Sequence, residues 1–289
     1  MHDCSFLVET MSNFEDYDKK SLSYDKGGRY PVCVDQILEH IPAECSLLDA
    51  GCGTGNYMVP LVNSGKLSRY TGFDGSAGMI AKIRVKSNLL RENKDLKTEI
   101  AEIQQVCLPK SLPYGNNDFD MILHNQVMHH IVDPDQKDKF AKVKTYLAEF
   151  HRVLKPGGVL TINTCTHSQL AAQWYFKGMP GVLAKQKSIY PSDKQIIQLL
   201  LEAGFKNVSS HTDHTPYLGE SYFHYKNCFT KEFREADSVW ACANQQETAE
   251  LLDKMKVILS DEEQRARFDE QVRKEIAAVG TTTQIFARK

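Results

Sequence analysis

Strand-like and helix-like segments alternate along most of the chain, and this alternation limits the fold more than any other feature. Short apolar runs are each followed by a stretch with helical periodicity. The pattern predicts a mostly parallel, doubly wound α/β sheet, with helices on both faces. The expected strands are 46–50, 70–73, 99–103, 119–125, 159–165, 205–210 and 281–288.

Residues 213–278 break the alternation, because an aromatic segment and two helical stretches stand there between the last two expected strands. Residues 1–30 are polar, with several tyrosines and a Gly-Gly pair, and predict a flexible arm. We therefore expect four parts along the chain. They are an N-terminal lid (1–30), a core (31–212), an α-rich cap insertion (213–278) and a terminal strand of the core (279–289).

Charge and cysteine usage narrow the partners and the compartment. The 289 residues include 35 basic and 37 acidic ones, and this balance argues against a nucleic-acid partner. The acidic N-terminus is unlike a signal peptide, and no apolar run approaches the roughly 20 residues that span a membrane. The eight cysteines are scattered without a C-x-x-C pair, which favours free thiols. We expect a soluble, cytoplasmic protein without a membrane partner.

A glycine-rich turn, LLDAGCGTG at 47–55, carries the strongest functional signal. Glycine is needed where a chain leaves a strand, turns sharply and lets a ligand lie against its backbone. The G-x-G-x-G spacing differs from the G-x-G-x-x-G of dinucleotide sites, and no Gly-Lys-Ser/Thr follows to bind phosphates. Asp49 at the strand end would repel a pyrophosphate, so the turn favours a cationic ligand.

Asp74 ends the next expected strand. A carboxylate at that position can accept hydrogen bonds from both hydroxyls of a ribose. Taken alone, Asp74 is more readily explained as a cap of the following helix, where Ser76 is also placed as the N-cap.

Four motifs in this order, LLDAGCGTG, GFDGSAGMI, FDMIL and RVLKPGGVL, resemble those of class I (Rossmann-like) S-adenosylmethionine-dependent methyltransferases. The run VMHHI before RVLKPGG resembles the small-molecule, ubiquinone-biosynthesis-type branch. The resemblance covers about 35–210 and the last strand. It implies a seven-stranded sheet in the order 3-2-1-4-5-7-6 with the last strand antiparallel. It also implies methyl transfer from S-adenosyl-L-methionine (EC 2.1.1) to a small molecule.

The resemblance also implies which residues bind the cofactor. Asp49 and the three glycines would hold the methionine portion, with Asn125 beside it. Asp74 would bind the ribose, Met79 would pack near the adenine, and Glu102 and the Ile103 amide would contact the adenine. Glu99 is an alternative to Glu102, and core packing is an equal reading of Met79. The implied set is Asp49, Gly51, Gly53, Gly55, Asp74, Met79, Glu102, Ile103 and Asn125.

Histidines follow the ends of the fourth and fifth expected strands, where open α/β sheets bind ligands. His129 and His130 are the candidate catalytic bases, although such a pair can also only shape a site. His124 is expected in the core, and His167 near the acceptor. The spacing of the histidines between 211 and 224 fits no compact zinc pattern, so no metal site is expected.

The arm and the aromatic insert are the expected walls of the acceptor pocket. Rings shield a site at low entropic cost, and Arg29 can bind a carboxylate bidentately. The aromatic residues of the insert can equally form the core of the cap. The candidate substrate-binding residues are Tyr24, Arg29, His167, Tyr217, Tyr222 and Phe223.

Three other functions remain open from the sequence: a protein methyltransferase, an arsenite methyltransferase, and a catalytically silent partner subunit that only binds the cofactor. The acceptor atom and the oligomeric state are not predicted.

Overall fold

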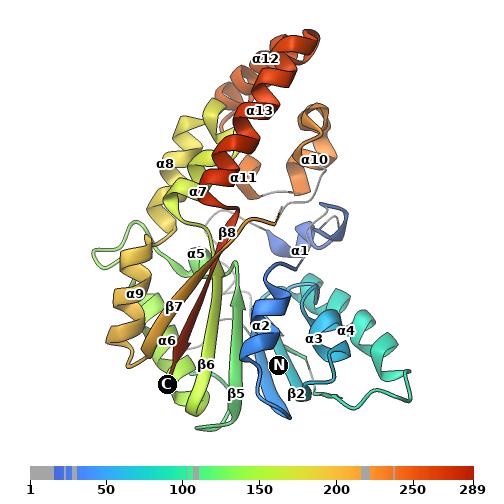
Figure 1. Cartoon of the computed structure of the whole chain (residues 1–289), viewed down its shortest axis with the longest axis vertical. Coiled ribbons are helices and arrows are strands. Elements are labelled where there is room, and N and C mark those ends of the chain that lie inside the picture. Colours follow the sequence, from blue (N-terminus) through green and yellow to red (C-terminus); the bar gives the residue numbers. More distant parts are fainter. Residues whose placement is uncertain are drawn as a thin grey trace.

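The computed structural model describes residues 16–22, 24–27, 31–101, 103–106, 111–215, 222–236 and 238–289. Its centre is one sheet of eight strands, flanked by helices and surmounted by a group of further helices (Figure 1). These strands are β1 (Cys45–Ala50), β2 (Leu67–Asp74), β3 (Glu99–Ile100), β4 (Gln104–Gln105), β5 (Phe119–Asn125), β6 (Leu154–Thr164), β7 (Lys206–Asp213) and β8 (Thr282–Arg288).

The strand order confirms the predicted topology. The sheet runs β3-β2-β1-β5-β6-β8-β7, with β4 as a second partner of β2. All pairs up to β6 are parallel, and β8 runs antiparallel to both β6 and β7. Renumbered over the seven expected strands, this is the order 3-2-1-4-5-7-6.

Successive strand residues are buried on opposite faces of the sheet, as a strand repeat of two residues requires. Leu47 and Leu48 are both fully buried, but they belong to two different apolar clusters. One face is covered by α2 (Val34–His40), α3 (Met58–Asn63) and α4 (Ala77–Arg91), and the other by α6 (Ala141–Val153) and α9 (Asp193–Glu202). The sheet is therefore wound on both sides.

The third expected strand is split into two short ones, β3 and β4, which both pair with β2. Two arginines of α4 bind the carbonyl groups between them. Arg91 Nη2 donates to the oxygens of Ile100 and Ala101, and Arg84 donates to the oxygen of Ile103. These carbonyl oxygens accept hydrogen bonds from side chains. The prediction of one continuous strand at 99–103 is therefore wrong.

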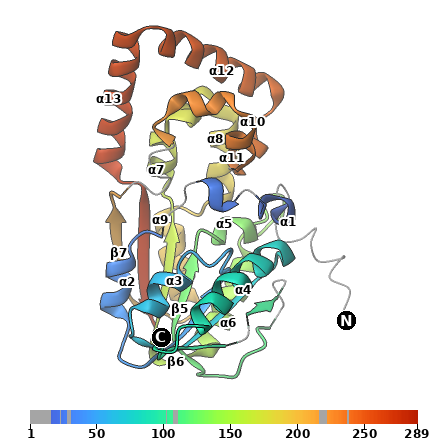
Figure 2. The ribbon, with the colours of Figure 1, turned by 90° about the vertical axis from the view of Figure 1, so that its right-hand side faces the viewer.

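Helices on the carboxyl side of the sheet form a separate layer, seen above the strands in Figure 1 and side-on in Figure 2. Between β7 and β8 come η6 (Tyr225–Phe229), α10 (Lys231–Ala236), α11 (Ser238–Ala241), α12 (Gln245–Ser260) and α13 (Glu262–Val279). They pack against three elements that follow β6, namely α7 (His167–Ala172), η4 (Trp174–Gly178) and α8 (Pro180–Ile189). Their aromatic centre includes Trp174, Tyr175, Tyr222 and Trp240. We call this layer the helical cap.

The helical cap is continuous with the core of the sheet, because one apolar cluster runs from Leu48 of β1 to Val272 of α13. Two pieces of the N-terminal arm, α1 (Tyr17–Lys20) and η3 (Tyr24–Gly27), lie between the sheet and the cap in both views. Within the described part of the chain, no helix has the length and apolar character needed to cross a membrane.

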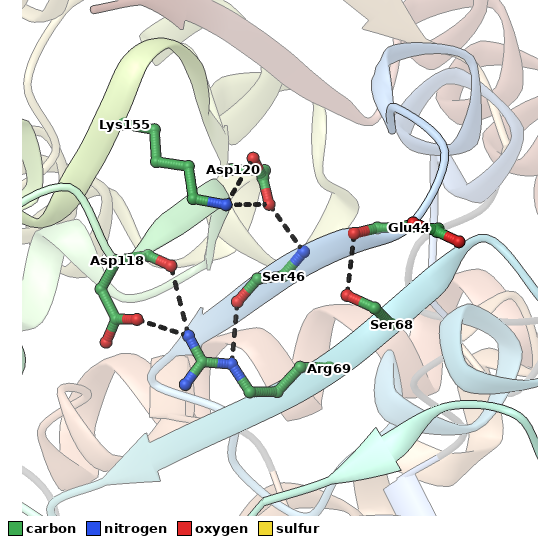
Figure 3. A network of polar contacts seen from close by, with 7 residues as sticks. All are labelled: Glu44, Ser46, Ser68, Arg69, Asp118, Asp120 and Lys155. Atoms are coloured by element: carbon green, nitrogen blue, oxygen red, sulfur yellow. Dashed lines mark hydrogen bonds and ion pairs between the residues drawn. The ribbon is translucent and has the colours of Figure 1, made fainter.

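The opposite, amino edge of the sheet is held by paired charges (Figure 3). Arg69 bonds to Asp118 Oδ1 at 2.6 Å and to Ser46 Oγ at 2.9 Å. Asp120 Oδ2 accepts from Lys155 Nζ at 2.8 Å and from the Ser46 amide at 2.9 Å. This network joins the starting ends of β1, β2, β5 and β6.

Candidate active site

The glycine-rich turn leaves β1 with all three glycines at positive φ, the left-handed region that favours glycine. A Cβ on Gly51 would lie 2.4 Å from Val127, and one on Gly55 would lie 2.6 Å from Ile83. Those two glycines allow close packing. A Cβ on Gly53 would meet nothing within 4 Å, so the middle of the turn faces open space.

Asp74 fixes this turn from the end of β2. Its Oδ2 accepts from the Gly53 amide at 2.9 Å, and its Oδ1 accepts from the Ser76 amide at 2.9 Å. Burial raises its pKa, and the amide bonds oppose that shift. Each carboxylate oxygen can accept a second hydrogen bond. Ser76 Oγ accepts from the Met79 amide, so the predicted N-cap of α4 is confirmed.

Asp49 is buried beneath the turn, with 2% of its surface exposed. Tyr70 donates a hydrogen bond to its Oδ2 at 2.6 Å. Burial raises the pKa of Asp49 to about 7; the Tyr70 hydroxyl lowers it and the nearby Asp74 raises it further. The carboxyl group is thus poised to titrate near neutral pH.

The structure describes three of the four remaining residues of the implied cofactor set. Asn125 ends β5, and its buried Oδ1 accepts no hydrogen bond from the described residues. Met79 and Ile103 are both buried, and Ile103 packs in the apolar cluster beneath α4. Glu102 lies outside the described residues.

The N-terminal arm binds to the start of α4 and to the glycine-rich turn. Asp18 Oδ1 accepts from Ser76 Oγ at 2.6 Å and from the Gly78 amide at 2.9 Å, at the start of α4. Asp25 accepts from Thr54 Oγ1 of the glycine-rich turn at 2.6 Å and pairs with Lys86 Nζ at 3.2 Å. The arm therefore covers the turn and the start of α4.

The two candidate bases lie on α5 (Met128–Ile131), directly after the Val127 that packs on Gly51. His130 Nε2 bonds to the Tyr17 hydroxyl of the arm at 2.8 Å. His129 Nε2 bonds to the Tyr190 hydroxyl at 3.2 Å, and its ring stacks on Tyr190 with centroids 4.1 Å apart. The histidine rings lie 3.9 Å apart, so arm, sheet edge and cap meet here.

His167 reaches the same cluster through its hydrogen bond to the Tyr190 carbonyl at 2.8 Å. His124 is fully buried, and its Nδ1 donates to the Ala50 carbonyl at 3.0 Å. Burial lowers its pKa to about 4. The expected separation of His124 in the core from His129, His130 and His167 at the edge matches this arrangement.

The two candidate substrate residues of the cap that the structure describes, Tyr222 and Phe223, pack within the cap itself. Tyr222 is buried, and its carbonyl accepts from Trp174 Nε1 at 2.9 Å. The Arg273 guanidinium lies 4.5 Å from the centre of the Phe223 ring. These contacts favour the second reading of the aromatic insert, as core of the cap. Tyr24 lies partly buried on η3, and Arg29 and Tyr217 lie outside the described residues.

A family model described as a methyltransferase domain matches residues 26–210, which is more than half of the chain. The chain belongs to this family. As a methyltransferase it uses S-adenosyl-L-methionine, the cofactor that the motifs predicted.

The methyltransferase is 29% identical to a malonyl-[acyl-carrier protein] O-methyltransferase of Hahella chejuensis, over 55% of this chain and 50% of that protein. It is 27% identical to a demethylmenaquinone methyltransferase of Oceanobacillus iheyensis, over 58% of this chain and 73% of that protein. It thus spans half the length of the first of these relatives. The solved structure of a protein described as a methyltransferase from an antibiotic biosynthesis pathway of Anabaena variabilis has a TM-score of 0.65 at 17% identity. The match covers 91% of this chain and 99% of that one. That likeness concerns the fold.

Three observations on this methyltransferase fit its cofactor. The open direction at Gly53 leaves room against the backbone, and the buried Asn125 Oδ1 has acceptor capacity that no described residue uses. Asp74 accepts from the amides of Gly53, Ser76 and Gly75, and its carboxylate keeps acceptor capacity beyond these bonds, as binding to a ribose requires.

Sequence reasoning missed three parts of this site. Tyr190 carries no motif signal, because the chain between it and His129 includes β6 and four helical segments. Asp18 was not distinguished from the other acids of the arm. Gln126 stands next to Asn125, but its backbone conformation is visible only in the structure. Among the described residues, no three His, Cys, Asp or Glu side chains gather into a possible metal site.

Proposed function

We propose that this methyltransferase transfers the methyl group to a small-molecule acceptor bound between the arm, α5 and the helical cap. The observation that carries the proposal is the cluster of Tyr17, His130, His129 and Tyr190, which joins these three parts beside the glycine-rich turn. The demethylmenaquinone methyltransferase among the relatives supports a small acceptor of this kind.

S-adenosyl-L-methionine supplies a methyl group already activated by the sulfonium. The chain therefore has to position the acceptor, shield the reacting atoms from water and remove a proton from the acceptor. The glycine-rich turn and Asp74 hold the cofactor, and Asp18 and Asp25 close the arm over that place. Closure excludes water, which would otherwise compete at the reacting atoms.

His130 is the proposed base. It is only partly buried, whereas His129 is enclosed between His130 and Tyr190. His130 would take the proton that the acceptor atom loses as it receives the methyl group. Tyr17 positions the His130 ring through its hydroxyl. A base in this role contributes about 10²- to 10⁴-fold to the rate.

The test is mass spectrometry of a native metabolite extract incubated with the protein and methyl-labelled cofactor. We expect a labelled small molecule, and a fall of about 10²-fold or more in its rate of formation for His130→Gln. His211→Gln is the matched control, because His211 is exposed on β7. Label only in the protein fraction would indicate a protein methyltransferase. Cofactor binding without any labelled product would indicate a silent partner subunit.

A further inference from the structure

Gln126 is the one residue at the carboxyl end of β5 with a left-handed backbone, at φ 53°. Residues with a Cβ rarely adopt this conformation, and those that do so cluster at functional sites. Its amide donates to the Asn163 carbonyl of β6 at 2.9 Å, which holds the turn in place. Gln126 stands between Asn125, with its unused buried oxygen, and Val127, which packs on Gly51.

The side chain of Gln126 begins a chain of buried amides that crosses β6 to β8. Gln126 Nε2 donates to Asn163 Oδ1 at 2.9 Å. Asn163 Nδ2 donates to Gln284 Oε1 at 3.1 Å and to Thr282 Oγ1 at 3.2 Å. Gln284 Nε2 in turn donates to the Thr161 hydroxyl. Asn163 and Gln284 are almost completely buried, so water cannot replace these partners.

Cys165 fixes the direction of this chain. Its thiol donates to the Thr281 carbonyl at 3.7 Å, so its sulfur is left to accept from Gln126 Nε2 at 3.6 Å. Both hydrogens of the Gln126 amide are thereby used, one by Asn163 and one by Cys165. Gln126 Oε1 accepts no hydrogen bond from the described residues and is not sealed from solvent. The Oε1 oxygen that remains can only accept a hydrogen bond.

We propose that Gln126 is a specificity-determining residue, whose Oε1 selects acceptor molecules that present an O–H or N–H group. This inference rests on the proposed function and names the substrate class of that same site. A hydroxyl or an amine donates to Oε1, whereas a carboxylate or an ether presents only lone pairs to it and is disfavoured.

The same selection separates substrate from product when the acceptor is a hydroxyl. The hydroxyl hydrogen donates to Oε1 while the acceptor is bound and passes to His130 as the methyl group replaces it, so the product ether has no hydrogen to donate. The bond to Oε1 is lost at the moment the product forms. Gln126 therefore favours binding of the substrate over retention of its product.

The experiment compares phenol with its O-methylated counterpart anisole, and benzyl alcohol with benzoate, as binding probes. Dissociation constants are measured by ligand-observed NMR on the full chain saturated with S-adenosylhomocysteine. We expect phenol to bind about 3- to 10-fold more tightly than anisole, and benzyl alcohol more tightly than benzoate, as one net hydrogen bond allows. In Gln126→Gly both ratios should fall toward 1.

Glycine at 126 suits the left-handed backbone, so this variant removes Oε1 without backbone strain, although it also removes the donor to Asn163 Oδ1. Asn207→Gly is the matched control, because Asn207 has a similar φ of 48° on the exposed part of β7. It should keep both ratios. Equal binding of phenol and anisole by the natural protein, no binding of phenol, or unchanged ratios in Gln126→Gly would each overturn the inference. Failure of the proposed function is a different result, namely no labelled product from the metabolite extract whatever the ratios.

Discussion

At the amino ends of the strands charged groups are paired with one another, whereas at the carboxyl ends polar groups keep unused hydrogen-bonding capacity. Arg69, Asp118, Asp120 and Lys155 all have ionic partners within 2.8 Å. At the other edge, the buried Asn125 Oδ1 has no partner among the described residues, and Asp49 is a carboxyl group whose pKa lies near 7.

Stability and function are thus separated between the amino edge and the carboxyl edge of the sheet. A buried polar atom without a partner costs free energy, and such atoms persist where a ligand completes them. The amino edge contributes to holding the strands together, and its exposed ion pairs are each worth little. Four substitutions, at Asp74, Asp49, Tyr17 and Arg69, test this separation.

Asp74→Ala should lower cofactor affinity by about 2–4 kcal/mol, because two charge-assisted hydrogen bonds to the ribose are lost. That corresponds to a roughly 30- to 700-fold rise in the dissociation constant, measured by calorimetry. The variant also frees the Gly53 and Ser76 amides, so some loss of stability accompanies it. Asp120→Ala is the control at the amino edge, and it should bind the cofactor normally. Normal affinity in Asp74→Ala would mean that the ribose is bound elsewhere.

Asp49→Asn should raise the free energy of unfolding at pH 8, by roughly 2–4 kcal/mol, and leave it nearly unchanged at pH 4. The native pKa of about 7 lies above the ordinary value of 3.8. The protonated form therefore stabilises the native state, and this contribution is lost as the pH rises between those values. Denaturant unfolding at both pH values measures the effect. A constant difference between variant and natural protein would show that Asp49 does not titrate in this range.

Tyr17→Phe should reduce kcat/KM about five- to tenfold, since it removes one hydrogen bond worth about 1 kcal/mol and leaves the ring in place. Steady-state kinetics with the identified acceptor measure this. Tyr225→Phe is the matched control, because the Tyr225 hydroxyl bonds to Asp269 within the cap. A similar loss of activity in both variants would contradict a specific role for the arm.

Arg69→Met should cost about 1 kcal/mol of stability or less, and should leave cofactor affinity and turnover unchanged. Its ion pair with Asp118 is about one-third exposed, and its stem can still pack near the Phe119 ring. Thermal unfolding and calorimetry measure the two quantities. A loss of cofactor affinity would show that the two edges of the sheet are coupled.

The sequence was sufficient for the sheet because the signals that build it are local. The turn at 47–55, the N-cap Ser76 and the apolar strand at 119–125 each show their role within a few residues. The sheet order came from the resemblance of four motifs, and the structure confirms it. The split of 99–103 could not be predicted, because it depends on Arg84 and Arg91 reaching across from α4.

The acceptor side of the site was less accessible to sequence reasoning, since its contacts join distant parts of the chain. Tyr17 meets His130 from the arm, and Tyr190 meets His129 from the end of α8. Tyr222 was expected in the pocket from its aromatic character, but the same character places it against Trp174 and Phe233 in the cap. Composition alone does not distinguish these two uses of a ring.

Asp213 of β7 pairs with Thr282 of β8, so the chain that connects these strands starts and ends at adjacent positions in the sheet. In topological terms, these strands are the two arms of a β-hairpin, and residues 214–281 are its loop. Lengthening such a loop costs little, about 0.6 kcal/mol of closure entropy for each doubling of its length. The loop can therefore be exchanged for a longer or shorter one while the strands that carry it stay in register. In evolutionary terms, the same sheet can carry different insertions between these two strands.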